Sequence, residues 1–139
     1  MRFGVGLMQY FQADDGAWSE VTRTEVADSQ ITVTDKEAEI MTGYFGRHQI
    51  HTGKVSLDPV KSLKQFCLYP TGRPIELNLI YPKPNKPELR LYLNRSKGFK
   101  PAASDIWFFY LKDNCLFLGH LKPADWEFVR NRRVSPIKA

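Results

Sequence analysis

Two stretches in the second half of the chain alternate apolar and polar residues with the period of a β-strand. Leucine or tyrosine occupies every second position from Leu77 to Tyr81, and leucine does so from Leu89 to Leu93. Residues 82–88, between the two stretches, include three prolines and one asparagine, which interrupt a sheet ladder. The pattern predicts a β-hairpin with a stiff tip that projects from the sheet.

Clusters of β-branched and aromatic residues predict further strands. These strands are expected at residues 3–11, 31–34, 66–69, 105–111 and 115–118. The first is expected to be buried. The last two are separated only by a short polar turn, so they predict a second hairpin.

Helical signals are fewer. Thr34 and Glu37 form a capping-box pattern, which predicts a helix that runs toward Tyr44. Residues 59–62 are expected to form a turn or short helix, and residues 124–134 a short helix. The chain is therefore predicted to be β-rich, mainly β with one or two short helices.

A long polar segment, residues 12–29, separates the first two predicted strands. It has a turn signal at Asp15 and Gly16 and contains an isolated tryptophan, Trp18. Connections of this length in a small domain are usually functional. We therefore expect an exposed functional loop.

The length of 139 residues and a hydrophobic content of 42% fit one domain with a real core. We expect this domain to span residues 1–130, followed by a basic tail or linker at 131–139. No apolar run approaches the roughly 18 residues of a membrane span, and the start of the chain lacks a signal-peptide pattern. These features predict a cytoplasmic protein with no membrane partner.

Charge is unevenly distributed along the chain. Residues 1–40 contain three cations and eight acids, a net charge of −5, whereas the whole chain carries +5, so residues 41–139 carry +10. Residues 83–100 contain six cations against one acid, a net charge of +5. Such asymmetry is typical of a protein that presents one face to a polyanion, and nucleic acid is the expected partner.

Motifs for catalysis are absent from the sequence. No Glu-x-Lys pair of the kind used by magnesium-dependent nucleases occurs, and no glycine-rich phosphate loop is present. Cys67 and Cys115 lie in apolar runs, where cysteine usually acts as a small core residue, so a disulfide is possible but less expected. We predict no catalytic residue and no cofactor in this chain.

The three histidines have ordinary structural interpretations. His48 and His51 lie in a donor-rich stretch, residues 47–54, with spacing that suits a metal, but no third ligand is near them in the sequence. They are interpreted as part of a polar loop rather than a metal site. His120 follows a predicted strand, where a histidine is usually structural.

The order of these elements resembles the DNA-recognition domain of EcoRII-type restriction endonucleases, a pseudobarrel shared with the plant B3 domains. The similarity rests on a first strand at 5–11, a polar arm at 12–29, a strand and helix at 30–45, the basic hairpin, and an aromatic strand at 104–109. The resemblance implies a B3-like DNA-binding pseudobarrel. It further implies sequence-specific recognition of double-stranded DNA as the specificity domain of a restriction endonuclease, with the catalytic nuclease domain or subunit outside this chain.

In that family two arms grip the duplex from its major groove. By resemblance, the N-terminal arm holds Trp18, Ser19, Thr22, Arg23 and Thr24, and the C-terminal arm holds Tyr81, Lys83, Asn85, Lys86 and Arg90. Arg95 and Lys97 would support contacts to the DNA backbone.

Two other classes of function stay open from the sequence. A modified-base or RNA-binding barrel domain would need an aromatic pocket, for which Trp18, Tyr44 and Phe45 are the candidates. A protein-interaction module would use the same sheet edges without nucleic acid.

Overall fold

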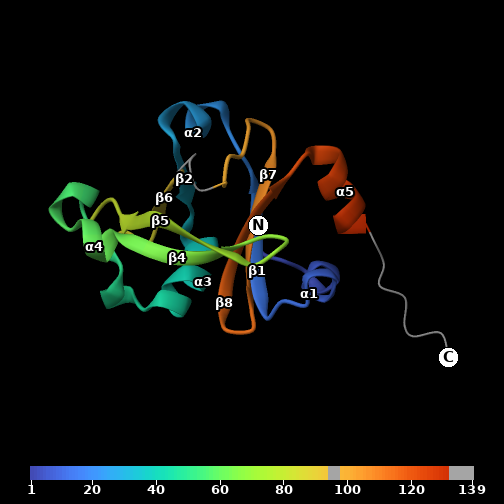
Figure 1. Ribbon diagram of the computed structural model, residues 1–139, viewed down its shortest axis with the longest axis horizontal. Helices are drawn as coiled ribbons and strands as arrows, with labels where there is room; N and C mark the ends of the chain where they lie inside the picture. The colour runs from blue at the N-terminus through green and yellow to red at the C-terminus, as the bar shows by residue number, and fades with distance from the viewer. Residues whose placement is uncertain (94–97, 132–139) are drawn as a thin grey trace.

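The computed structural model describes residues 1–93 and 98–131. Its strands are β1 (Asp15–Glu20), β2 (Gln30–Val33), β3 (His51–Thr52), β4 (Leu63–Leu68), β5 (Arg73–Tyr81), β6 (Leu89–Tyr92), β7 (Ile106–Lys112) and β8 (Cys115–Leu121). They form a sheet in the order β1-β7-β8-β4-β5-β6-β2, and β3 pairs with β5 outside this path. The sheet curls into a half-barrel (Figure 1), so the expectation of a β-rich, barrel-like fold is confirmed.

Helices are more numerous than the sequence pattern indicated. Among the described residues they are α1 (Val5–Phe11), α2 (Arg23–Asp28), α3 (Asp35–Phe45), α4 (Pro59–Ser62) and α5 (Pro123–Asn131), with single 3-10 turns η1 (Arg47–Gln49) and η2 (Val55–Leu57). The expectation of one or two short helices was therefore wrong. No helix in the described part of the chain is both long and apolar enough to span a membrane.

The expected first strand, residues 3–11, was a wrong prediction, because most of it is helix α1. Phe3, Leu7 and Phe11 are buried in one hydrophobic cluster. Their spacing of four residues is the period of a helix face and not of a strand. The expectation that this segment is buried holds for these three side chains.

The expected functional loop at residues 12–29 was also wrong. β1 pairs antiparallel with β7 along its whole length, and its Ala17 is fully buried. α2 follows, closed at its start by a capping box in which the Thr22 hydroxyl accepts from the Glu25 N–H and the Glu25 carboxylate accepts from the Thr22 N–H. Residues 12–29 therefore form a strand and a helix, although their composition is polar.

Both predicted hairpins are confirmed. β5 and β6 pair antiparallel, with Leu79 opposite Leu91. β7 and β8 are joined by Asp113 and Asn114, whose φ angles of 52° and 60° are those of a type I′ turn. The predicted helix after Thr34 is α3, which ends at Gly46.

The two faces of β7 pack into two different cores. Trp107 and Phe109 face the inside of the half-barrel and join its hydrophobic cluster, whereas Phe108 and Tyr110 join the cluster formed with α1 and α5. Figure 1 shows α1 and α5 on this outer side of the sheet. The aromatic strand is therefore buried on both faces and fixes the helices to the sheet.

A buried carboxylate connects the start of β7 to β8. Asp105 is 3% exposed. Its Oδ2 accepts hydrogen bonds from the Ala102 N–H and from Nδ1 of His120, each at 3.0 Å, and the Lys122 Nζ lies 3.3 Å from Oδ1. The interpretation of His120 as a structural histidine is confirmed.

The Asp105 cluster predicts a pH dependence of stability. Burial acts to raise the pKa of Asp105, but the Ala102 N–H, His120 and Lys122 outweigh it and hold this pKa below its usual value. A carboxyl with a lowered folded-state pKa stabilises the protein above its unfolded-state pKa, and this contribution is lost as the pH falls through the folded-state pKa.

We therefore expect an Asp105→Asn variant to lose about 1–3 kcal/mol of unfolding free energy at neutral pH. Its stability should then fall less than that of the wild type between neutral pH and about pH 3. Urea denaturation at both pH values measures this difference. If acidification lowers the stability of both proteins equally, the pKa of Asp105 is not lowered in the folded protein.

Candidate nucleic-acid interface

The two segments richest in exposed cations leave the sheet at the same end. β3 and β5 are parallel, with Thr52 opposite Tyr81, and both strands end at these residues. The Gly53 N–H donates to the Tyr81 carbonyl at 2.9 Å. Because parallel strands point the same way, segment 53–62 and the hairpin tip 82–88 both start at this edge of the sheet. In Figure 1 this edge is on the left, beside α4 and away from α1 and α5. We call it the basic end: residues 47–64 and 82–90.

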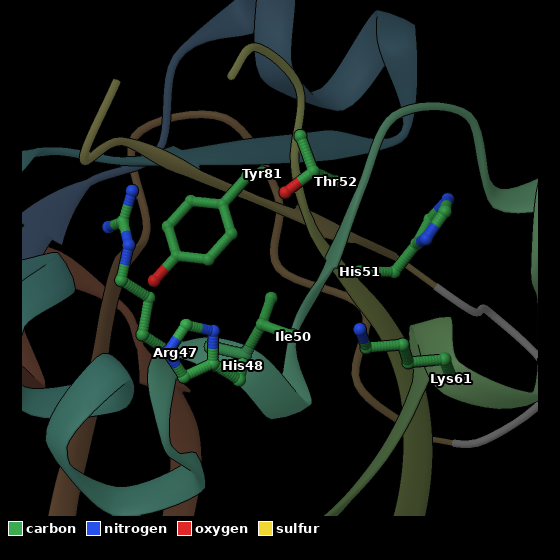
Figure 2. Close-up of a pocket in the computed structure, with 7 residues that line it drawn as sticks. All are labelled: Arg47, His48, Ile50, His51, Thr52, Lys61 and Tyr81. Carbon is green, nitrogen blue, oxygen red and sulfur yellow. The ribbon is translucent and has the colours of Figure 1, made fainter. Parts of the chain in front are cut away.

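An open cavity of about 330 Å³ lies at the basic end. It is lined by Arg47, His48, Ile50, His51, Thr52, Lys61 and Tyr81, with no acidic side chain among them. Figure 2 shows Arg47, His48 and Tyr81 on one side of this cavity, and His51 and Lys61 on the other. The lining comes from η1, β3, α4 and β5, so residues distant in the sequence form one basic pocket.

Arg47 is held over an aromatic ring. Its guanidinium carbon lies 5.1 Å from the centroid of Tyr81. The ring is itself fixed, because Tyr81 is 3% exposed and its hydroxyl is 2.8 Å from the Thr42 hydroxyl of α3. Tyr81 therefore orients Arg47 from inside the protein. It does not form an exposed contact of the hairpin arm, which is a correction to its predicted position.

The opposite side of the pocket is built by local hydrogen bonds. An imidazole N–H at Nε2 of His51 donates to the Lys54 carbonyl at 2.9 Å. Lys61 lies in α4, whose start is closed by Asp58, with Oδ1 accepting from the Lys61 N–H at 3.0 Å. The Lys61 ammonium is left without an ion pair in the described part of the chain.

Positive charge at the basic end is largely unneutralised. Residues 47–64 contain four Lys or Arg and one acid, and residues 82–90 contain three and one, giving +3 and +2 with histidines neutral. Arg47, Lys61, Lys83, Lys86 and Arg90 make no ion pair within residues 1–93 and 98–131. Burial, followed by the charge of Lys61, lowers the pKa of Lys64. The cations repel one another and attract an anion.

Three predicted residues of the C-terminal arm are presented to solvent at the hairpin tip. Lys83, Asn85 and Lys86 are exposed, and Asn85 has a φ of 63°, a left-handed conformation that asparagine tolerates in a turn. Arg90 is half-buried in β6, opposite Ile80 and Thr32.

The predicted residues of the N-terminal arm do not join this surface. Trp18 is in β1 and packs on Trp126 with ring centroids 5.4 Å apart, and Ser19 accepts from the Trp107 indole N–H at 2.8 Å. Both residues have internal contacts and lie in a strand, not a loop.

The rest of that predicted arm belongs to α2. Thr22 caps the helix, and Arg23 and Thr24 are exposed in its first turn. α2 leads into β2, which runs antiparallel to β6. α2 and the hairpin tip therefore lie at opposite ends of β6, about 13 Å apart along the strand. Arg95 and Lys97, the last two predicted site residues, lie outside the described residues.

Tyr81 is the one lining residue that the sequence selected as a site residue, and the two strongest cations of the pocket, Arg47 and Lys61, were both missed. The donor-rich stretch at 47–54 was a partial signal for Arg47. Lys61 had none, because only the folding of α4 beside β5 brings it to the pocket.

A second cavity, of about 430 Å³, brings together two of the three aromatic candidates for base reading. It is lined by Tyr44, Phe45, Gln65, Phe66, Cys67, Cys115 and Leu116. Trp18 is not part of it. Cys67 and Cys115 are free and half-buried, so neither is the core residue we expected. Burial, followed by the neighbouring Cys115 thiol, raises the pKa of Cys67.

Residues 1–93 and 98–131 hold no group of three or more His, Cys, Asp or Glu side chains placed to bind a metal ion. Comparison of the chain with protein-family models, with curated proteins and with solved structures gave no match.

Proposed function

We propose that this protein binds double-stranded DNA through the basic end of its half-barrel. The observation that carries the proposal is the set of unpaired cations in residues 47–64 and 82–90, which the parallel pairing of β3 with β5 brings to one edge of the sheet. A duplex presents phosphates at regular spacing, so several cations on one edge can bind it at once. Neutralising the phosphates releases counterions, which makes the affinity depend on salt.

We assign phosphate contacts to the pocket and base contacts to the hairpin tip, because the two parts differ in shape. The pocket around Arg47 and Lys61 is concave and cationic and would hold a phosphate. The hairpin tip projects and carries Lys83, Asn85 and Lys86, side-chain types that donate to guanine and adenine edges in the major groove. The basic end supports one binding surface of two adjacent parts, in place of two separate arms.

We further propose the B3-like role that the resemblance implies. In this role, the chain recognises a short DNA sequence as the specificity domain of a restriction endonuclease, and a nuclease domain or subunit outside this chain supplies catalysis. What supports it is the β-rich half-barrel with a basic hairpin tip. Sequencing the duplexes that the protein retains from a random pool tests this proposal. A short enriched motif is the expected result, and retention without enrichment would limit the function to non-specific binding.

Two single substitutions separate base contacts from phosphate contacts. We expect Lys86→Ala to weaken binding to all duplexes similarly and to lower the slope of log affinity against log salt by about 1. Arg90→Ala should cost about 1–3 kcal/mol on the enriched site and relax its sequence preference if this arginine reads a base. Anisotropy titrations with the enriched and a scrambled duplex measure both effects. If both variants keep the affinity and the sequence preference of the wild type, the hairpin is not part of the DNA interface.

A further inference from the structure

A short protrusion beside the basic pocket exposes aliphatic side chains. η2 and α4 form it, and within it Leu57 is 74% exposed and Val60 is 87% exposed. Figure 1 shows α4 at the far left of the molecule, beyond the sheet. Exposed aliphatic residues are common singly, but these two lie three positions apart on one protrusion.

The protrusion is held in place by hydrogen bonds. The Leu57 N–H donates to the Lys54 carbonyl at 3.0 Å, and the Asp58 N–H donates to the Val55 carbonyl at 3.1 Å. The Ser62 hydroxyl is fully buried and donates to the Asp58 carbonyl at 2.8 Å. The backbone is therefore built to present Leu57 and Val60, and these side chains are not the surface of a loose loop.

The protrusion adjoins the cationic pocket, because Lys61 of α4 is one of the residues that line it. A methyl group of Leu57 and Nε2 of His51 each lie 3.8 Å from the position that a Cβ on Gly53 would take. Val60 precedes Lys61, which lines the pocket. A polyanion with one phosphate in the pocket would thus place its neighbouring groups beside the protrusion that exposes Leu57 and Val60.

The chemistry of this surface favours DNA over a membrane or a protein partner. A membrane surface is usually met by a larger apolar face with aromatic residues, and η2 and α4 contain none. A stable protein interface buries about 800 Å² on each partner, much more than two aliphatic side chains provide. In the DNA major groove, by contrast, the apolar group is a single methyl, on C5 of thymine.

We propose that Leu57 and Val60 contact thymine 5-methyl groups in the major groove while Arg47 and Lys61 hold an adjacent phosphate. This inference rests on the proposed DNA binding and adds to it a base preference. The face that reads thymine is then the η2–α4 protrusion, a segment for which the sequence pattern indicated no role.

The test replaces thymidine by deoxyuridine, which removes only the methyl group, in the duplex enriched from the random pool. Burying one methyl group contributes about 0.8 kcal/mol, so the wild type should bind the thymine duplex at least about fourfold more tightly than the uracil duplex. A Leu57→Ala/Val60→Ala variant should bind both duplexes equally, with the affinity of the wild type for the uracil duplex. Retained binding to the uracil duplex also shows that the variant is folded.

The matched control is Val5→Ala, because Val5 is also 74% exposed but lies in α1, on the opposite side of the molecule. This variant should keep the wild-type preference for thymine. Salt-sensitive binding without discrimination between the two duplexes, or an enriched site that lacks thymine, would overturn the inference and leave the DNA-binding proposal intact. Absence of duplex binding would overturn both.

A membrane role is tested in parallel by sedimentation with vesicles that contain phosphatidylserine. Wild-type binding to vesicles that is lost in Leu57→Ala/Val60→Ala, together with equal binding to thymine and uracil duplexes, would assign the protrusion to a lipid surface and overturn the inference.

Discussion

A Phe108→Ala variant is expected to lose about 3–5 kcal/mol of unfolding free energy, the usual cost of removing a fully buried phenylalanine. Phe108 is completely buried on the outer face of β7. Its ring centroid lies 5.0 Å from that of Phe11 and 5.3 Å from that of Trp126. The substitution would leave a cavity among α1, α5 and the sheet.

Urea denaturation measures this loss, and Phe128→Ala is its matched control. Phe128 lies in the same helix as Trp126 but is 68% exposed. Its replacement should change stability by no more than about 0.5 kcal/mol. Similar losses in the two variants would contradict the packing of α5 on β7 and, with it, the description of β7 as buried on both faces.

Removing the two cations that face each other across the basic pocket is expected to weaken binding to duplexes of every sequence. If Arg47 and Lys61 each contribute about 1 kcal/mol, an Arg47→Ala/Lys61→Ala variant should bind a duplex about thirtyfold more weakly. The slope of log affinity against log salt should fall by about 2. Both side chains are exposed, so stability should change little.

A double variant with the same change of net charge controls for long-range electrostatics. Arg23→Ala/Lys112→Ala also removes two positive charges, from α2 and from the end of β7, outside the basic end. It should keep nearly the wild-type affinity and salt slope. Equal weakening in the two double variants would mean that net charge, and not the pocket, determines binding. Greater weakening in the control would favour the N-terminal arm first predicted.

Elements with a strong local pattern were predictable from the sequence. The alternation of leucines defined β5 and β6, and a two-residue turn at Asp113 and Asn114 defined the second hairpin. The helix α3 was indicated by Thr34 and Glu37. In each, the local preference of the chain and its burial in the fold agree, which is why pattern alone was sufficient.

The elements that were missed have competing local signals. Phe3, Leu7 and Phe11 have helical spacing, but the aromatic and β-branched residues of the segment favoured a strand. β1 has only two apolar side chains, Ala17 and Trp18, and its partner β7 supplies most of the large side chains around it. A strand with so few apolar residues is stabilised by its neighbour, and its own sequence shows little of this.

The candidate site was only partly predictable for a related reason. The cationic hairpin tip was evident from Lys83 and Lys86. The pocket, in contrast, depends on the pairing of β3 with β5, and a parallel strand of two residues has no recognisable pattern. Without that pairing, nothing in the sequence places Arg47 near Lys61.

Equilibrium binding of the wild-type protein to a labelled duplex at two salt concentrations shows whether the basic end binds duplex DNA. We expect tight binding at low salt that weakens steeply as salt rises, because several phosphates are neutralised at once. Binding that does not change with salt, or no binding at the lower concentration, would contradict the proposed DNA binding and leave the basic end as a solvated surface.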